Sequence, residues 1–483
     1  MKATRKRDEE AAKELSRFGY AQELVRSMGG FSTFALSFSI ISVPTGIFSI
    51  YTQCLKSGGP AGVALGWPIV AAGTMIVALA MAELASAFPT AGALYHWSAL
   101  LGGPGAGWFT AMVNLVGQVA ACGAIDLACA QTLQVFFQTS KGGLYAMFAL
   151  VLASHALVNM VSVRLVAWLN SFSATVQIVG VLAVAGGLLA FARAQPVAFL
   201  AHTGFTTRPD GVWVLGFAQA SMLGLWTFTG YDASAHVSEE THDPARAAPR
   251  GIVTAVAVSA IAGWAIIAAI TLAIRDLPAE VEAGSVELHV LDALGARAAT
   301  ATMAVVASAM WFCGLSSITS SSRTLFAFAR DHGFPGAARV RLVDPRHGTP
   351  RVAIAIVSSA AWALVMCTAP VSDALVYSIT VIATMALYVS YAVPIGLGAI
   401  ARRAGTWTHR GPWQLGGAGV PLAWAAVAWS ACVCVLSSYA DPLSIAILGG
   451  IVAALAALWF LNVRGRFRGP EVTLAAFERR AED

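Results

Sequence analysis

Charge is what this sequence has least of. Charged side chains make up 11% of its 483 residues, whereas an ordinary soluble domain carries about 25%. A chain this poor in charge cannot cover a folded core with a surface that suits water. Metal and disulfide patterns are missing too, because the seven cysteines form no Cys-x-x-Cys pair and no histidine cluster accompanies them. We therefore expect buried, unpaired cysteines, no structural metal centre and no cofactor.

Apolar runs fill most of the chain instead. A helix needs about 20 apolar residues to cross a bilayer. The sequence predicts twelve such spans, at about 30–55, 62–88, 106–137, 144–162, 165–191, 212–238, 251–274, 298–328, 351–369, 372–400, 420–437 and 442–462. The polar stretch before the first span has mixed charge and no small-residue cleavage site, so we expect a retained helix rather than a signal peptide. This division leaves an N-terminal tail (1–26), a transmembrane region (27–463) and a C-terminal tail (464–483), with no room for a soluble domain.

The positive charges lie unevenly among the predicted loops. Of the 30 Lys and Arg residues, 24 fall on the side that carries both termini. The other side receives Lys56, Lys141, Arg193, Arg208, Arg275 and Arg297. Because cytoplasmic loops are enriched in Lys and Arg, we expect both termini inside and a multi-pass protein of the plasma (inner) membrane. The net charge of +5 is mostly this bias and calls for no nucleic-acid partner.

Two predicted spans contain helix-breaking residues near their centres. The first span carries "SIISVPTGIFS", with Pro44, Thr45 and Gly46, and the sixth carries "GLWTFTGYD", with Thr229 and Gly230. A single proline usually does no more than kink a helix. Backbone groups that lose their helical hydrogen bonds are tolerated at membrane depth only where they line a cavity or are buried in protein. The two breaks lie five spans apart, an odd number that gives the two halves opposite orientations. Interrupted segments at matching positions of such halves point to the central site of a transporter.

Such a pair of breaks suits a zwitterion. A half-helix that begins inside the membrane presents free N–H groups and a positive dipole end, which favour a carboxylate. A half-helix that ends there presents free carbonyl groups, which favour an ammonium group or a metal cation. The sequence therefore predicts one site that holds both ends of an amino acid or a related amine.

Several motifs resemble those of the amino acid–polyamine–organocation permeases. The stretch "FTGYDASAHVSEETHDPARAAPRGI" (228–252) is similar to the sixth-span signature of the amino acid/choline transporter branch, which includes GABA and choline permeases. Further stretches that resemble the family in the same order are 18–47, 81–97, 289–295 and 316–336. The resemblance covers about residues 18–465 and is specific to the family, though not to a substrate.

The resemblance implies an all-α integral membrane fold of twelve helices, with broken helices 1 and 6. Ten of them would form a five-plus-five inverted repeat, at 27–192 and 212–400, followed by two further helices at 420–463. Carboxylate contacts would fall on Pro44, Thr45 and Gly46. Ammonium contacts would fall on the carbonyl groups of Phe228, Thr229 and Gly230, and Phe228 or Tyr231 would close over the substrate.

Two deep carboxylates need a role, since an ionisable group inside a span is a functional candidate by default. Asp232 follows the sixth-span break directly. It would cap the inner half-helix or act in the gate, or it would contact the substrate. Asp126 lies on the third span with Gln118 on the same polar face. It would bind a cationic substrate or a proton, or it would pack against a polar neighbour.

The ends of the spans suggest gating and coupling residues. Glu83, Glu239 and Glu240 are expected to pair with Arg323, Arg330 or the basic loops, as inner-gate ion pairs or as plain surface salt bridges.

Some members of the resembled family carry a lysine on the fifth helix in place of sodium, and alignment places Gln177 near that position. Ser316 and Ser317 on the eighth helix could supply oxygen ligands to sodium, or they could hydrogen-bond between helices. We favour a proton over sodium as the coupling ion.

The sequence thus predicts a secondary transporter that moves amino acids or related amines through the lipid bilayer by alternating access. Sodium-coupled or exchange transport of choline, GABA or polyamines is the alternative. A membrane enzyme would need a nucleophile–base pair, a metal cluster or a cofactor motif within the spans, and the sequence has none of these. A non-transporting nutrient sensor would share the core motifs but is expected to have longer tails, and a channel would need a filter-like repeat.

Overall fold

The computed structural model describes residues 2–369 and 375–482. Within these ranges the secondary structure is helical, and a single parallel bridge between Met28 and Thr241 takes the place of any sheet. Ten helical stretches are long and apolar enough to cross a membrane. The all-α membrane fold predicted from the apolar runs is therefore confirmed.

The first half of the chain contains α1 (Lys2–Arg17), α2 (Gly30–Ile41), α3 (Val43–Ala87), α4 (Ala93–Phe137), α5 (Lys141–Val161) and α6 (Val163–Gly187). The broken sixth span consists of α7 (Trp213–Ala220), α8 (Met222–Thr227) and α9 (Ala233–His236). The chain continues with α10 (Pro244–Ala273), α11 (Leu277–Ala283), α12 (Val286–Asp292), α13 (Ala296–Arg330), α14 (Ala337–Val340), α15 (Arg351–Thr368), α16 (Leu375–Arg403), α17 (Gly419–Ala440), α18 (Pro442–Leu458) and α19 (Leu474–Glu482).

Two of the longest helices each consist of two segments. α3 has 45 residues and would reach about 68 Å at 1.5 Å per residue, roughly twice the hydrocarbon thickness. It bends at Gly59, whose φ of 66° is left-handed, and Pro60 starts the next segment. α4 bends in the same way at Gly103 and Pro104. The Gly59–Pro60 pair therefore falls between the first and second predicted spans, and the Gly103–Pro104 pair lies just before the predicted start of the third span at 106.

The count of twelve spans stays a prediction. The broken sixth span is not among the ten stretches, because its pieces are too short to cross a membrane alone. The predicted start of the tenth span at 372 lies outside the described residues, and α16 begins at Leu375. The boundaries of the two inverted repeats likewise stay predictions.

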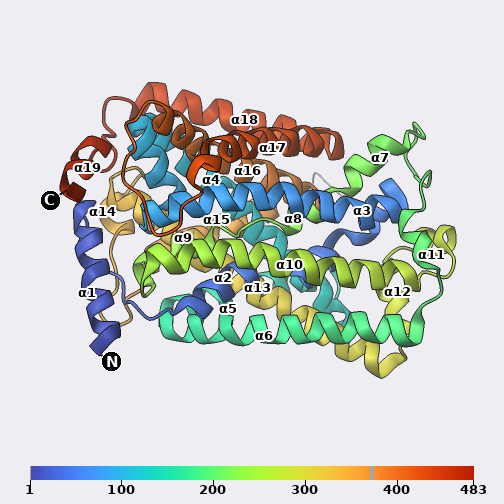
Figure 1. The fold of residues 1–483 in the computed structure, drawn as a ribbon. Coiled ribbons are helices and arrows are strands. Elements are labelled where there is room, and N and C mark those ends of the chain that lie inside the picture. The colour runs from blue at the N-terminus through green and yellow to red at the C-terminus, as the bar shows by residue number, and fades with distance from the viewer. Residues whose placement is uncertain (1, 370–374, 483) are drawn as a thin grey trace.

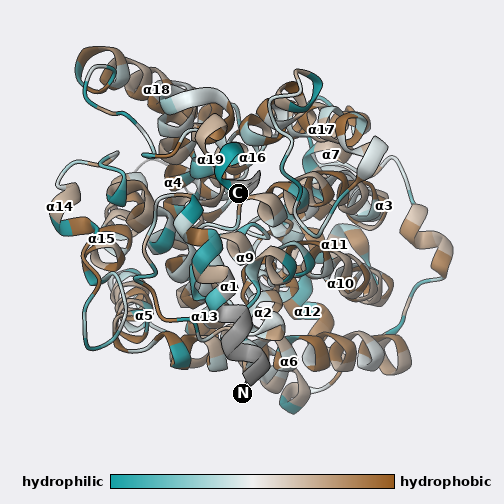
Figure 2. Ribbon diagram, turned by 60° about the vertical axis from the view of Figure 1, so that its left-hand side comes forward, coloured by the Kyte–Doolittle hydropathy of each residue, from teal (hydrophilic) through white to brown (hydrophobic). Residues whose placement is uncertain are grey.

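The long helices run side by side in one bundle (Figure 1). Both termini, α1, α14 and α19 lie at one end of this bundle, which we call the terminal end, while α7, α11 and α12 lie at the opposite end. Polar residues gather on α1, on α19 and on loops at this end (Figure 2). Large apolar side chains remain exposed along the sides, including Trp168, Phe191, Ile261 and Leu461. Such exposure suits a surface that meets lipid.

Candidate substrate site

The first break lies at Ser42, between α2 and α3. Ser42 has a left-handed φ of 36°, and it separates the two helices at full burial. Pro44 occupies the first turn of α3, where its missing N–H costs no hydrogen bond. The Ser42 and Thr45 hydroxyl groups lie 2.6 Å apart. The break is therefore two residues earlier than the Pro44–Gly46 position predicted from the sequence, because proline begins the second half-helix rather than ending the first.

The second break spans residues 228–232, between α8 and α9. Gly230 has a φ of 78°, and a Cβ atom there would lie 2.1 Å from Ile40 Cγ2. Glycine is thus required both by conformation and by the close approach of α2. The Gly230 N–H donates to the Tyr391 hydroxyl group at 3.2 Å, and the Tyr388 hydroxyl donates to the Phe228 carbonyl at 3.4 Å. Two tyrosines of α16 therefore hold the break open.

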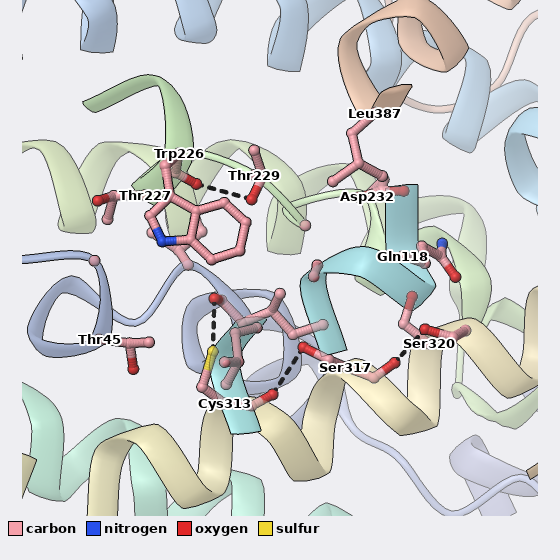
Figure 3. Close-up of a pocket in the computed structure, with 17 residues that line it drawn as sticks. Thr45, Gln118, Trp226, Thr227, Thr229, Asp232, Cys313, Ser317, Ser320 and Leu387 are labelled. Carbon is pink, nitrogen blue, oxygen red and sulfur yellow. Dashed lines mark hydrogen bonds between the residues drawn. The ribbon is translucent and has the colours of Figure 1, made fainter. Parts of the chain in front are cut away.

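A buried cavity lies where the two breaks meet (Figure 3). Its wall is formed by Ile40, Ile41, Thr45, Gly46, Gln118, Ala121, Ile125, Trp226, Thr227, Thr229, Gly230, Asp232, Cys313, Ser317, Ser320, Ser321 and Leu387. The wall combines apolar side chains, a few hydroxyl groups and one carboxylate. A pocket of this kind, mostly apolar with a few convergent polar groups, is typical of a small-molecule site.

Six residues predicted from the sequence to act in binding or coupling line this cavity: Thr45, Gly46, Thr229, Gly230, Asp232 and Ser317. The described wall does not include Pro44, Phe228 or Tyr231. Phe228 packs against Trp67 with ring centroids 4.7 Å apart, and Tyr231 packs against Tyr391 at 5.2 Å. Neither aromatic ring predicted to cover the substrate faces the cavity.

Trp226 is the aromatic residue of the cavity wall. Its indole ring projects into the cavity in Figure 3, and its backbone carbonyl accepts a hydrogen bond from the Thr229 hydroxyl at 2.8 Å. Trp226, Cys313, Ser320 and Leu387 belong to the cavity wall but were not predicted from the sequence. The run "SSITSSSR" at 316–323 could have indicated the serines, because it places many hydroxyl groups on one membrane helix.

Asp126 lies away from the cavity. Its carboxylate contacts His155 Nδ1 of α5 at 3.2 Å, and both side chains are fully buried. A Cβ atom on Gly314 of α13 would lie 2.0 Å from Asp126 Oδ1. The structure therefore places Asp126 in a contact between three helices, and its part in substrate binding stays a prediction.

Asp232 lies between the cavity and the terminal end. Its two carboxylate oxygens meet the Tyr391 hydroxyl group at 2.8 Å and His236 Nε2 at 3.1 Å. Asp232 is the N-cap residue of α9, but its side chain makes no capping hydrogen bond. Because one carboxylate both lines the cavity and contacts a histidine, the pair can hold a proton within reach of a bound molecule.

A chain of contacts continues from this pair toward the terminal end. His236 Nδ1 lies 3.3 Å from the Ala91 carbonyl oxygen, and the Ala91 N–H donates to Glu239 at 3.1 Å. Glu239 forms an ion pair with Arg330 at 2.9 Å. The cavity and the ion pair are thus connected through one buried backbone group.

The ion pairs close the terminal end of the bundle. Glu240 pairs with Arg323 at 2.9 Å, and both side chains are fully buried. Together with Glu239 and Arg330 they join the broken sixth span to α13, and these are the pairings expected from the sequence. We call the four residues the inner gate. A buried pair of this kind depends on both partners, since removal of one leaves the other charge uncompensated.

The N-terminal segment covers the inner gate. The Gln22 side chain donates to the Glu239 carbonyl at 2.8 Å, and the Ser27 and Met28 N–H groups both donate to the Glu240 carbonyl at 2.9 Å. The Arg330 guanidinium lies over the Tyr20 ring, 3.7 Å from the ring centroid. The Tyr20 hydroxyl group donates to the Asp331 carboxylate at 2.7 Å. Burial raises the pKa of Asp331 above its usual range.

Glu83 belongs to a different cluster. It forms an ion pair with Arg402 of α16 and accepts the Leu415 N–H at 3.0 Å. Arg402 in turn lies over the Trp407 ring at 4.5 Å. Glu83 therefore pairs with the last turn of α16, next to the basic stretch 402–410 that the sequence predicts as a loop, and it lies apart from the inner gate.

The residues considered for coupling are separated by the structure. Ser317 lines the cavity and donates to the Cys313 carbonyl at 2.9 Å, whereas Ser316 donates to Asn170 of α6 at 2.7 Å. Gln177 donates to the Ser173 hydroxyl at 2.8 Å and does not belong to the described cavity wall. The two serines thus face different neighbours.

Metal and disulfide chemistry finds no support in the described ranges. No group of three or more His, Cys, Asp or Glu side chains in them could hold a metal ion. The seven cysteines are unpaired, and Cys54, Cys122, Cys129 and Cys313 are buried.

The sequence matches the amino acid permease family over residues 28–465. The chain belongs to this family. An amino-acid permease BAT1 homolog of Oryza sativa subsp. japonica is 35% identical, with 95% of each chain covered. The amino-acid permease BAT1 of Arabidopsis thaliana is 34% identical over 94% of this chain and 95% of its own. A GABA-specific permease of Saccharomyces cerevisiae is 28% identical over 70% of this chain and 63% of its own.

A solved structure supports the same fold. A mutant manganese transporter of Eremococcus coleocola superposes with a TM-score of 0.59 over 90% of this chain and 95% of its own, at 14% identity. The permease is therefore a multi-pass membrane transporter with a transporter-type helical fold, and the family resemblance seen in its motifs is confirmed.

Proposed function

We propose that the permease is a secondary active transporter that carries an amino acid or a related small amine by alternating access, driven by protons. The observation that carries this proposal is the cavity itself, which is built from both helix breaks and contains one carboxylate, Asp232. The relatives named as amino-acid and GABA permeases support this substrate class.

The substrate carboxylate would bind at the start of α3, where Thr45 and Gly46 face the cavity and the helix dipole is positive. Its ammonium group would lie toward the end of α8 and Asp232. Trp226 would cover its side chain. The inner gate closes the terminal end, which we assign to the cytoplasm in the plasma membrane because of the Lys and Arg bias.

The proton would be held by Asp232 and His236, which share one contact at 3.1 Å. A sodium site at Ser316 and Ser317 has less support, since the two hydroxyl groups face different neighbours. Strict sodium dependence would nonetheless favour that site over the Asp232–His236 pair.

The test is uptake into liposomes that contain the purified permease. Radiolabelled neutral, acidic and basic amino acids, GABA, choline and a polyamine are offered with and without pH and sodium gradients. We expect uptake of at least one amino acid or GABA to rise when the outside is acidic and to survive removal of sodium.

A matched pair of tryptophan variants tests the cavity. Trp226→Ala should raise the Michaelis constant at least tenfold, whereas Trp168→Ala removes an exposed, lipid-facing ring and should leave transport unchanged. Equal effects of both variants would argue against the cavity as the binding site.

A further inference from the structure

A second cleft opens at the terminal end, away from the cavity. It lies between the α5–α6 junction, the α14–α15 loop and the N-terminal segment. Its wall is formed by Glu23, Val25, Val161, Ser162, Val163, Arg164, Arg330, Arg341, Leu342, Val343, Asp344, Pro345, Arg346, His347 and Gly348. Basic side chains outnumber acidic ones in this wall, and the transport site uses only Arg330 among them.

Three of its arginines have no partner within the described residues. Arg164, Arg341 and Arg346 are exposed, and their side chains make no hydrogen bond or ion pair with the part of the chain that the structure describes. Arg341 and Arg346 lie five residues apart between α14 and α15, whereas Arg164 lies in the first turn of α6, and the cleft brings these two places together. Guanidinium groups bind phosphate oxygens in a bidentate manner, so such a set favours a phosphate ligand.

The acidic residues of the wall do not cancel this charge. Asp344 accepts the Arg346 and His347 N–H groups at 2.8 and 3.1 Å and pairs with Arg351 at 3.0 Å. The hydrogen bond from His347 lowers the pKa of Asp344, which keeps the carboxylate ionised and committed to these partners. Glu23 alone is left to oppose the three free arginines.

The loop that presents the arginines is held in place. Asp344 donates its N–H to the Thr349 carbonyl at 2.9 Å, and the Thr349 hydroxyl donates to the Met160 carbonyl at 3.0 Å. A Cβ atom on Gly348 would lie 2.8 Å from Val25, so the loop also packs closely on the N-terminal segment. The backbone that carries Arg341 and Arg346 therefore needs little reorganisation to bind a ligand.

Apolar surface adjoins the basic wall. Val25, Val161 and Leu342 are 43%, 51% and 58% exposed. Arg164 precedes Trp168 and Phe172 on one face of α6, where the two rings are exposed and stack at 5.8 Å. Exposed tryptophans mark the interface between membrane and water. On α15, a shallow groove lined by Arg351, Val352, Ala355, Ile356 and Ser359 extends this apolar surface.

We infer that this cleft binds the phosphate headgroup of an anionic phospholipid, with its acyl chains along the exposed apolar residues of α5, α6 and α15. A soluble phosphate would gain nothing from Leu342 and Val161, whereas a lipid uses both parts of the site. The leaflet follows from the orientation in the proposed function, and anionic lipids are enriched on the cytoplasmic side.

The test is lipid binding by the purified full-length permease, measured by native mass spectrometry with dioleoylphosphatidylglycerol and dioleoylphosphatidylcholine. We expect the anionic lipid to bind at least tenfold more tightly. An R164Q/R341Q/R346Q variant should lose at least tenfold of that affinity. A control variant, R250Q/R403Q/R468Q, removes the same charge from exposed arginines outside the cleft and should change it less than twofold.

A further variant and a competition experiment complete the test. Glu23→Gln removes the opposing carboxylate and should strengthen phosphatidylglycerol binding, which keeps the test valid if the triple variant does not fold. An excess of inorganic phosphate over the lipid should not displace it. Equal losses in both triple variants, no preference for the anionic lipid, or displacement by phosphate would overturn the inference. Because binding is measured without transport, a failed uptake assay leaves this result intact.

Discussion

Gly46 and Thr227 touch where the two broken helices cross. A Cβ atom on Gly46 would lie 1.9 Å from Thr227 Oγ1 and 2.7 Å from Thr227 Cβ. Real atoms do not approach so closely, and Thr227 cannot move aside easily because its β-branched side chain is stiff. The sequence suggests that Gly46 lets the backbone come close to a ligand. The structure shows that the missing side chain of Gly46 lets α3 pack closely against α8.

This contact predicts a strong and repairable defect. Gly46→Ala should abolish transport and lower the melting temperature, because the added methyl group overpacks the crossing. Thr227→Gly in the same chain should restore much of the melting temperature, since it removes the opposing atoms. Thermal unfolding in detergent checks this pair, and a double variant no more stable than Gly46→Ala would contradict it.

Asp232 and His236 should share control of the pH dependence of uptake. Asp232→Asn keeps the shape but cannot release a proton, and His236→Gln keeps a polar contact without the ring. We expect each variant to flatten the rise in uptake between pH 7.5 and 5.5, with a loss of at least tenfold in rate, or about 1.4 kcal/mol. Initial rates at fixed substrate concentration measure this. Acid-stimulated uptake by Asp232→Asn would move the proton site elsewhere.

Asp126 should matter for stability rather than for substrate affinity. Asp126→Asn weakens the contact with buried His155 and should cost about 1–3 kcal/mol of unfolding free energy. The Michaelis constant should stay within twofold for every substrate found, because the side chain lies outside the described cavity wall. A large rise in the constant for cationic substrates alone would restore the substrate role predicted from the sequence.

The Glu240–Arg323 pair should behave as a unit. Either Glu240→Gln or Arg323→Gln leaves a fully buried charge without its partner and should destabilise the protein by about 3–5 kcal/mol. The double variant should be more stable than the sum of the two changes predicts. A double-mutant cycle on melting temperatures tests this coupling, and strict additivity would show that the pair contributes little.

Glu14 should make the docking of α1 sensitive to pH. Burial raises its pKa from 4.5 to about 7, although Arg17 opposes the shift. Because the folded protein binds this proton more tightly than the unfolded chain, its stabilisation is full below about pH 4.5 and is lost as the pH rises through 7. Glu14→Gln should therefore protect α1 from limited proteolysis at pH 8 but not at pH 5. Equal protection of α1 at pH 5 and pH 8 would contradict the raised pKa of Glu14.

Much of the architecture follows from local sequence. Apolar runs of sufficient length, the Gly-Pro pairs at Gly59 and Gly103, and the break after Thr227 all depend on nearby residues, and each is found in the structure. The position of the first break was harder to predict, since Ser42 is left-handed without being glycine. Its conformation is held by the surrounding helices rather than by its own preference.

The site was predicted less completely because side-chain direction depends on how helices rotate against one another. Trp226 and Phe228 lie two residues apart on the same break, yet one faces the cavity and the other faces Trp67. Asp126 and Asp232 look alike in sequence as deep carboxylates. Their different roles follow from His155 on α5 and from Tyr391 on α16, which are distant along the chain.

The N-terminal segment that hydrogen-bonds to the broken sixth span gives the protein a kinetic constraint. Gln22, Ser27 and Met28 bond to the backbone of Glu239 and Glu240. Under the proposed mechanism this end must open and close once for every molecule carried. The N-terminal segment must then detach and reattach at the same frequency, or it must move together with the half-helix to which it is bonded. These hydrogen bonds therefore contribute to the free-energy barrier that sets the turnover rate. Shortening the tail before Gln22 would change the turnover rate even where the substrate affinity stays the same.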